Sequence, residues 1–373
     1  MKRNIKVLIL SDPSSSHTSK WVNSLFDAGI DLILIGLADY DFNEYNRNIK
    51  IEVIDFSKSA KGKPDGDPRK LVYLRSISFV KKIIKSFKPD ILHAHYASSY
   101  GLIGALCGFQ PLLVSVWGND VYDFPKKSFI HKKSFEYVLK KSYRIFSTSK
   151  IMADEISKYT NKNIKIIPFG IDVSIFKPFE TEKLFPGDTI ILGAVKSLSY
   201  KYGNDKVIKA YKIVKEKLPE YNLKLLLVGD GILKQKMEEL VVSLGLTDDV
   251  KFIGKVPHSQ VTKYHNMIDI HIYPSIWESF GVSNLEAAAC EKVQVASNIG
   301  GFKEILNDGI DSFLVDPNSL EDIVDKIILL IKNKELRIKM GKEARNNVIK
   351  KFNWQDNVKD MIEEYYSVLK GYK

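Results

Sequence analysis

The stretch DIHIYPSIWESFGVSNLEAAACEKVQVASN, from Asp269 to Asn298, contains one complete repeating unit of the fold. Residues 269–275 form an apolar, β-rich run that predicts a strand, and residues 276–281 form a loop. Residues 282–292 have the pattern of a helix, and residues 292–298 are again strand-like. A strand, a helix and a strand in this order predict two parallel strands with the helix packed against their sheet.

The same alternation continues along the chain in two series. It is typical of α/β domains with a parallel sheet covered by helices on both faces. We therefore expect two Rossmann-like domains, residues 1–170 and 171–352, joined near a turn-rich segment at 169–188. Residues 352–369 predict a last helix with Asn353 as its N-cap. Strands are predicted at 5–11, 31–36, 89–97, 111–118, 143–149, 164–170, 188–197, 223–231, 249–256, 269–275, 292–298 and 311–317.

Length and cysteine content restrict the class of protein. A chain of 373 residues is too long for one ordinary hydrophobic core. Its two cysteines, Cys107 and Cys290, imply no disulfide framework and fit a reducing cytoplasm. The N-terminal apolar run is short and broken by Lys6, so we interpret it as a first strand and not as a signal peptide. No apolar run approaches the roughly 18 residues of a membrane-spanning helix.

The net charge of +11 favours an anionic partner, such as nucleotide phosphates, acidic lipid or nucleic acid. Residues 69–88 carry seven basic and no acidic side chains, and residues 126–150 carry eight basic side chains against one acid, Glu136. Aromatic residues are interleaved in the second segment. Two interpretations stay open: solvated helix faces that bury some aromatics, or basic amphipathic helices that rest on anionic lipid.

Two glutamates surround the start of the helix predicted after residue 281. Ligands of open α/β sheets bind at the carboxyl ends of the strands, and this helix start lies there. Its unpaired N–H groups and dipole offer an anion site over residues 280–283, and Gly281 permits close backbone approach. Glu278 and Glu286 can accept hydrogen bonds from vicinal hydroxyls on either side of a phosphate. The pattern predicts a sugar, a diphosphate and a ribose; the alternative is two ordinary helix-surface carboxylates.

The first two strands of the second domain end in further candidates for donor binding. Lys196 and Lys201 follow the first of these strands, where lysines can neutralise a leaving diphosphate or can simply be solvated. Gly229 lies in the turn VGDG after the next strand, which allows close packing against a nucleotide base or ribose.

Three polar residues end strands of the first domain. His93 and His95 alternate, so we expect His93 in the core and His95 at the ligand-binding edge, where it could bind a hydroxyl. Asp120 follows the next strand, and either binds an acceptor hydroxyl or caps a helix.

Several other chemistries find no support in the sequence. There is no G-x-G-x-x-G, no P-loop motif, no G-x-S-x-G elbow and no Cys/His spacing typical of zinc. The DGD at 65–67 lies in a loop rich in Lys, Gly and Pro, and not at a strand end, where a metal-binding motif of this kind would be expected.

Taken together, these segments resemble the retaining glycosyltransferases of family 4, which have the GT-B fold. The resemblance is strongest in the second half, over NIKIIPFGIDVSIFKP (163–178), LLLVGDGILKQKMEEL (225–240) and residues 250–323, which contain an E-x7-E motif at Glu278 and Glu286. The first half matches more loosely, through ILHAHYASSYG (91–101), SVWGNDV (115–121) and FSTSKIMADEI (146–156).

The resemblance implies two domains facing a central cleft, with a C-terminal helix, about residues 353–373, crossing back to the first. It implies that Glu278 contacts donor-sugar hydroxyls, that Glu286 contacts the ribose, and that Phe280, Gly281 and Val282 offer backbone to the diphosphate. Transfer would retain the anomeric configuration without a metal or other cofactor. The sequence departs from the family at the usual Arg–Lys pair, where it has VKSLSYKYG (195–203), in its serine-rich first loop, and at Trp117, where many members have His.

The leading hypothesis is an enzyme that moves a hexose from a nucleoside diphosphate sugar to a glycan or polyprenyl-linked saccharide. The setting would be cell-surface polysaccharide biosynthesis, such as lipopolysaccharide or capsule, in the cytoplasm or at the inner membrane face through the basic segments, without nucleic acid as a partner. One alternative is another GT-B enzyme, such as a nucleotide-sugar epimerase. An alternative of another class is a non-catalytic module that binds anionic membrane or nucleic acid.

Overall fold

The computed structural model describes residues 4–56, 60, 63, 66–182 and 184–372. The chain divides into two compact units. Unit 1 comprises residues 1–168 and 356–373, and unit 2 comprises residues 169–355. The division lies two residues before the one expected at 170 and three residues after the one expected at 352. Each unit is a parallel sheet with helices between its strands, which confirms the predicted α/β class.

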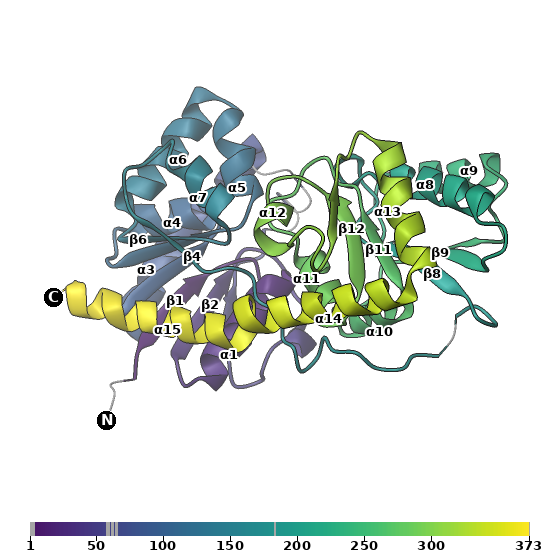
Figure 1. The fold of residues 1–373 in the computed structure, drawn as a ribbon. Coiled ribbons are helices and arrows are strands. Elements are labelled where there is room, and N and C mark those ends of the chain that lie inside the picture. Colours follow the sequence, from purple (N-terminus) through teal and green to yellow (C-terminus); the bar gives the residue numbers. More distant parts are fainter. Residues whose placement is uncertain (1–3, 57–59, 61–62, 64–65, 183, 373) are drawn as a thin grey trace. The chain divides into compact units, whose positions relative to one another are not determined.

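The sheet of unit 1 has the strand order β3-β2-β1-β4-β5-β6-β7, and all pairs are parallel. Strands β1, β2, β4 and β6 are labelled in Figure 1. Its order reverses between β1 and β4, which pair directly from Val7 to Ile91 onward. The strands are β1 Lys6–Leu10, β2 Asp31–Gly36, β3 Lys50–Val53, β4 Ile91–His95, β5 Leu112–Val116, β6 Arg144–Ser147 and β7 Ile164–Ile166.

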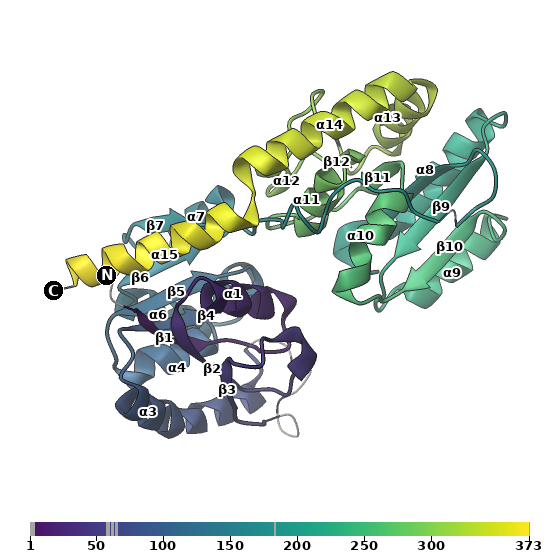
Figure 2. The ribbon, with the colours of Figure 1, turned by 90° about the horizontal axis from the view of Figure 1, so that it is seen from below.

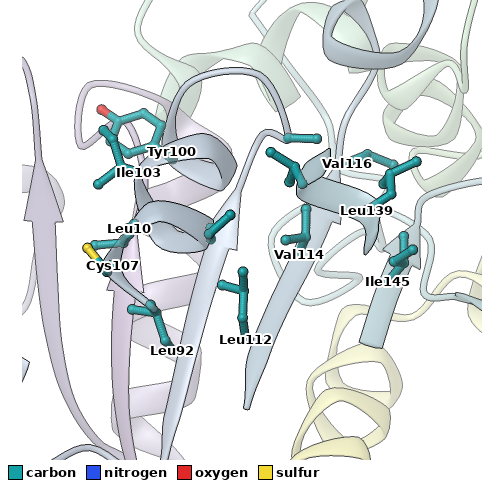
Figure 3. Close-up of a cluster of buried hydrophobic side chains, with 14 of the residues drawn as sticks. Leu10, Leu92, Tyr100, Ile103, Cys107, Leu112, Val114, Val116, Leu139 and Ile145 are labelled. Atoms are coloured by element: carbon teal, nitrogen blue, oxygen red, sulfur yellow. The ribbon is translucent and has the colours of Figure 1, made fainter. Parts of the chain in front are cut away.

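Apolar side chains from the central strands of unit 1 are buried against its helices. Figure 3 shows Leu10, Leu92 and Leu112 in one cluster with Ile103 and Cys107 of α4 (Tyr100–Cys107). Strands that are apolar along their whole length and buried on both faces are expected where helices cover both sides of a parallel sheet. The helices are α1 Ser16–Asp27, α3 Ser76–Phe87, α4 Tyr100–Cys107, α5 Asn119–Tyr122, α6 Phe129–Lys141 and α7 Lys150–Ile156, with 3-10 turns η1 Phe42–Glu44, η2 Pro68–Arg75 and η3 Phe124–Lys126.

The last helix, α15 Trp354–Gly371, ends the chain in unit 1 (Figure 2). The Oδ1 atom of Asn353 accepts a hydrogen bond from the backbone N–H of Gln355 at 3.4 Å, as predicted for an N-cap. Within unit 1, the hydroxyl of Tyr365 lies 2.7 Å from Nδ1 of His93 on β4, and Glu364 forms an ion pair with Arg144 of β6. The helix therefore covers the sheet at β4 and β6.

The sheet of unit 2 repeats this topology with six strands in the order β10-β9-β8-β11-β12-β13, all parallel. Its order reverses between β8 and β11. The strands are β8 Ile190–Val195, β9 Leu223–Val228, β10 Val250–Gly254, β11 Ile270–Tyr273, β12 Val293–Ser297 and β13 Phe313–Val315. The helices are α8 Asn204–Lys217, α9 Lys234–Ser243, α10 His258–Met267, α11 Val282–Ala289, α12 Phe302–Ile305, α13 Leu320–Lys332 and α14 Lys334–Lys351, with a 3-10 turn η4 Tyr200–Tyr202.

The predicted strands agree with the observed ones to within a few residues at their ends. The prediction missed β3, a short edge strand whose residues are exposed or only partly buried and which pairs only with β2. Within the described residues, no helix is long and apolar enough to cross a membrane.

Candidate functional site

The carboxyl ends of β8 and β11 meet at the centre of the sheet of unit 2. These strands are neighbours although β9 and β10 come between them in sequence, so the loops after them diverge around a shared space. This reversal of strand order is where open α/β sheets bind ligands. The loop after β8 supplies Lys196, and the loop after β11 supplies Glu278. The topology therefore brings two of the predicted site residues together.

Lys196 and Glu278 form an ion pair, with Nζ 2.6 Å from Oε2. Their side chains are only 11% and 9% exposed, so the pair is largely shielded from solvent. The ammonium also lies 4.5 Å from the ring centroid of Tyr202, a cation–π contact. The other carboxylate oxygen of Glu278, Oε1, accepts no hydrogen bond from a described residue. The pair thus leaves one acceptor and two ammonium protons for a ligand.

Lys201 lies beside this pair on η4. Its ammonium is 5.0 Å from the ring centroid of Tyr202 and 5.2 Å from that of Trp277, so two aromatic faces hold it. Burial raises the pKa of Tyr202, and the charge of Glu278 raises it further, so its hydroxyl stays protonated. A second cation is therefore available next to Lys196. Trp277, which the sequence did not single out, belongs to this cluster.

The start of α11 follows directly in the same loop. Gly281 has a φ of +102°, and a Cβ there would lie 2.8 Å from Phe302, so only glycine fits. Phe280 is 3% exposed, and its ring centroid lies 6.0 Å from that of Phe352. Because its side chain is apolar, only its backbone could hydrogen-bond to a ligand. Among the described residues, the N–H groups of Gly281 and Val282 find no acceptor. They form the helix N-terminus predicted as an anion site.

Gly229 packs closely against the loop after β8. A Cβ at this position would lie 2.2 Å from the backbone oxygen of Lys196, and one at Gly231 would lie 2.3 Å from that of Leu198. Gly229 therefore shapes the loop that carries Lys196, and its contact with a nucleotide stays a prediction.

Glu286 is buried on α11, and both of its carboxylate oxygens have partners. Nε2 of His258 lies 2.9 Å from Oε1, and Nε2 of His265 lies 3.4 Å from Oε2. Burial alone would raise the pKa of Glu286, but the two hydrogen bonds outweigh it and lower the pKa to about 2. The carboxylate is therefore ionised and can only accept hydrogen bonds.

His258 and His265 were not among the site residues predicted from the sequence. They lie seven residues apart, which places them on one face of α10, two turns from each other. Two histidines at this spacing, near an expected ligand-binding edge, could have been recognised from the sequence as candidate site residues. A third histidine of the group, His271, is buried on β11, with Nε2 3.0 Å from Nδ1 of His265.

In unit 1, His95 lies at the reversal of strand order between β1 and β4. Its side chain is buried, and its Nδ1 lies 3.0 Å from the hydroxyl of Ser11 at the end of β1. Burial lowers the pKa of His95 well below its usual value, and the neighbouring His93 lowers it further, so the ring is neutral. Its Nε2 makes no hydrogen bond to a described residue. His93 itself is buried between Tyr365 and Ser115, as predicted.

Asp120 does not have the surroundings predicted for a residue that binds an acceptor. It is fully buried, and its carboxylate accepts backbone hydrogen bonds from Trp117 and Gly118 at one oxygen and from Ala97 at the other. These bonds join the loop after β5 to the loop after β4. Asp120 does not cap the helix either, since it lies inside α5, whose N-cap is Gly118; its carboxylate instead links the two loops.

Metal binding is not supported at the DGD segment. Asp65 lies outside the described residues, and Asp67 pairs with Arg69 at 2.6 Å. Within the described residues, no three His, Cys, Asp or Glu side chains are grouped so that they could hold a metal ion.

Chemically, unit 2 therefore combines cations and backbone N–H groups with carboxylates on each side. Lys196, Lys201 and the start of α11 can bind an anion. Glu278 and Glu286 can accept hydrogen bonds from hydroxyls. This arrangement suits a ligand whose charged centre is flanked by two hydroxylated groups.

Family models match both halves of the chain. The model described as Glycosyl transferases group 1 matches residues 176–347, which include every candidate residue of unit 2. The model described as Glycosyl transferase 4-like matches residues 6–149. An uncharacterized glycosyltransferase of Methanocaldococcus jannaschii is 28% identical over 94% of this chain and 93% of its own. The N-acetyl-alpha-D-glucosaminyl L-malate synthase of Bacillus anthracis is 27% identical over 76% of each chain.

Solved structures share the fold over nearly the whole chain. Sucrose-phosphate synthase from Thermosynechococcus elongatus superposes with a TM-score of 0.82 at 18% identity, covering 99% of this chain and 100% of that one. The Anabaena protein HepE, solved in complex with UDP and glucose, superposes with a TM-score of 0.75 at 18% identity, covering 98% and 100%. At these identities the likeness shows the fold alone, and this fold is GT-B.

Proposed function

The chain belongs to the group 1, family 4-like glycosyltransferases, and from this premise we propose that it transfers a hexose from a nucleoside diphosphate sugar to a glycan or polyprenyl-linked saccharide. The product would serve cell-surface polysaccharide biosynthesis, such as lipopolysaccharide or capsule. The observation that carries the proposal is the Lys196–Glu278 pair beside the start of α11, at the reversal of strand order in unit 2. A cation, backbone donors and a hydroxyl acceptor meet there.

Each part of a nucleoside diphosphate sugar would have a binding group among these residues. The diphosphate would bind the N–H groups of Gly281 and Val282 together with Lys196, and Lys201 would add a second charge. The free Oε1 of Glu278 would accept a hydroxyl of the transferred sugar. Glu286 would accept the ribose hydroxyls. That HepE was solved with UDP, with UDP and glucose and with UDP-glucose supports a nucleotide sugar as the donor.

We propose a retaining, metal-independent transfer by front-face attack. The bond from the anomeric carbon to the diphosphate oxygen breaks, and the acceptor oxygen bonds to the same face of that carbon. The acceptor proton passes to the leaving diphosphate oxygen, so no protein base is required. Lys196 and the N–H groups of α11 would stabilise the negative charge that develops on the leaving group. In unit 1, the neutral His95 is the remaining candidate for an acceptor hydroxyl.

A thermal-shift screen of UDP-, GDP- and ADP-sugars tests the donor assignment. A true donor binds only the folded protein and should raise its stability by about 2.7 kcal/mol at a hundred times its Kd. The matched variant Glu278→Ala should lose the part of the shift that depends on the sugar and keep the part given by the free nucleoside diphosphate. If no nucleotide sugar shifts the wild type, the proposal is wrong.

Mass spectrometry of the bound donor separates transfer from epimerisation. An epimerase would convert its nucleotide sugar in the absence of any acceptor, whereas a transferase would release the nucleoside diphosphate only with an acceptor or slowly to water. Retained turnover in a chelator would support metal independence, and its loss would contradict it.

We further propose that unit 1 rests on the inner face of the cell membrane, which would make the protein cytoplasmic and peripheral. Leu71, Phe129 and Ile130 are 64%, 72% and 77% exposed. The bond of 3.0 Å from Nε2 of His131 to the backbone oxygen of Gly66 ties the start of α6 to the segment before η2. Exposed apolar side chains among lysines are typical of proteins that bind anionic membranes.

We call this region the basic surface of unit 1. It comprises the apolar residues above together with lysines on α3 and α6, of which Lys132 and Lys133 pair with Glu136. Helix α3 packs against η2 and α4, and α4 packs against α6, so these elements lie on one side of the sheet. Its lysines on α3, which are exposed, are Lys81, Lys82 and Lys85.

A further inference from the structure

The buried carboxylate of Glu286 is held symmetrically, one imidazole on each oxygen. His258 begins α10 and is half-exposed, with 54% of its side chain accessible, whereas His265 is fully buried. Because the carboxylate is ionised, Nε2 of each histidine must carry a proton and donate it to Glu286. Phe176 packs beside both rings, with centroid distances of 5.6 and 6.2 Å, which restricts their rotation.

The position of the proton on His271, the ring next to His265, also follows from its contacts. Burial lowers the pKa of His271 well below its usual value, so this ring carries one proton. Its Nδ1 is buried and meets no partner among the described residues. A proton on that nitrogen would be an unmet buried donor, so the proton resides on Nε2 and is donated to Nδ1 of His265. His271, His265 and Glu286 thus form one chain of hydrogen bonds that all point toward the carboxylate.

The two histidines determine where Glu286 can still accept hydrogen bonds. A carboxylate has about four lone-pair positions, two on each oxygen. Each imidazole occupies one, which leaves one on each oxygen. Two hydroxyls on neighbouring carbons, held on the same side of a ring, would fill both positions together. Ribose offers such a pair at its 2′ and 3′ carbons.

We propose that His258 and His265 are positioning residues for nucleoside recognition: they orient Glu286 so that its two free acceptor positions receive the cis-diol of the donor ribose. This inference rests on the proposed function, since it concerns the nucleotide part of the same donor. It assigns the discrimination between ribose and deoxyribose to two histidines that do not themselves need to touch the ligand.

Calorimetric titration with UDP and GDP, each compared with its 2′,3′-dideoxy analogue, tests the assignment. In the wild type, the hydroxyls should improve binding by about tenfold to hundredfold, as expected for one or two hydrogen bonds to a charged group. His258→Ala and His265→Leu should each reduce this preference to a few-fold while leaving the affinity for the dideoxy analogue unchanged. His265→Gln should restore most of it, because its amide N–H can still donate to Oε2.

A merely structural role would give a different result, since affinity for both nucleotides would then fall in parallel and the preference would persist. Either a retained preference or a parallel loss in His258→Ala would overturn the inference. His258 is half-exposed, so this variant serves even if His265→Leu does not fold. A wild type that binds neither UDP nor GDP would instead contradict the nucleotide-donor assignment from which the inference starts.

Discussion

The ammonium of Lys196 lies 2.6 Å from the carboxylate of Glu278, although 82 residues separate the two in sequence. The pairing follows from strand order, since β8 and β11 are neighbours in the sheet and each residue follows one of them. Both groups were predicted to bind the donor separately. In the structure each also holds the other in place, so a change to one affects the surroundings of the other.

Glu278→Ala should abolish transfer, because the sugar loses its hydroxyl acceptor. It should also destabilise unit 2, since it leaves a largely buried ammonium without its partner. We expect Lys196→Ala to recover part of that loss, giving a coupling of roughly 1–3 kcal/mol in a double-mutant cycle measured by urea unfolding.

The exposed pair Glu182 and Lys263 provides the control cycle, since its side chains are 91% and 45% accessible and its atoms are 3.5 Å apart. Its coupling should lie between about 0 and 1 kcal/mol. Equal coupling in the two cycles would show that the Lys196–Glu278 pair is as well solvated as a surface pair. Wild-type turnover in Glu278→Ala would remove this residue from the site.

Asp120→Ala should destabilise the protein strongly, because three buried backbone N–H groups would lose their acceptor. A loss of at least about 2 kcal/mol in free energy of unfolding is expected from one or two such bonds to a charged group. Asp154→Ala is a matched control, since that carboxylate is 62% exposed and pairs with an exposed lysine. If Asp120→Ala reduced turnover alone, with unchanged stability, the role of Asp120 in joining the loops after β4 and β5 would be wrong.

Acid should weaken the protein through Glu286. Its pKa is about 2 in the folded protein and 4.5 when unperturbed, so the unfolded state takes up the proton first as pH falls. The stabilisation is present above about pH 4.5 and is lost as pH falls toward 2, by about 3 kcal/mol at most. Unfolding in urea at pH 6 and pH 3 should show a smaller loss for Glu286→Gln than for the wild type. Identical losses in both would contradict the depressed pKa.

Membrane attachment should depend on the basic surface of unit 1. Changing Lys81, Lys82 and Lys85 to Ser should weaken binding to vesicles containing phosphatidylserine by roughly a hundredfold, at about 1 kcal/mol per lysine. The double change Phe129→Ser and Ile130→Ser should weaken it at high salt as well, because burial of apolar surface is not screened. Vesicle sedimentation measures both effects.

A control removes the same charge elsewhere. Lys334, Lys339 and Lys342 are exposed on α14 of unit 2, and their change to Ser should leave sedimentation unaltered. Equal release by both triple variants would mean that net charge, and not this surface, attracts the protein. Salt-sensitive binding of nucleic acid in place of vesicles would favour the non-catalytic alternative.

The alternation of apolar strands and amphipathic helices was enough to predict both sheets, because their strands are buried and therefore strongly patterned. The edge strand β3 escaped because Lys50 and Glu52 interrupt its apolar run. The position of Glu278 and Lys196 at one sheet edge followed from topology. Their direct contact did not, since it depends on side-chain rotamers that no sequence pattern specifies.

Two other features of the site differ in how far the sequence could have predicted them. His258 and His265 carry a helical spacing that could have been read, and their partner Glu286 was already a candidate. The role of Asp120 could not be assigned, because a carboxylate after a strand looks the same whether it faces a ligand or its own backbone. Only the three-dimensional course of the loop after β5, which turns the N–H groups of Trp117 and Gly118 toward Asp120, decides between them.

The discontinuity of unit 1 has a consequence for synthesis on the ribosome. Unit 2 is a single continuous segment and can be completed while the chain is still being made. Unit 1 combines residues 1–168 with residues 356–373, which bring Tyr365 to His93. Its sheet therefore stays without part of helix α15 until the whole of unit 2 has been translated. A chain that stops before residue 356 would keep all of unit 2 and lack a complete unit 1.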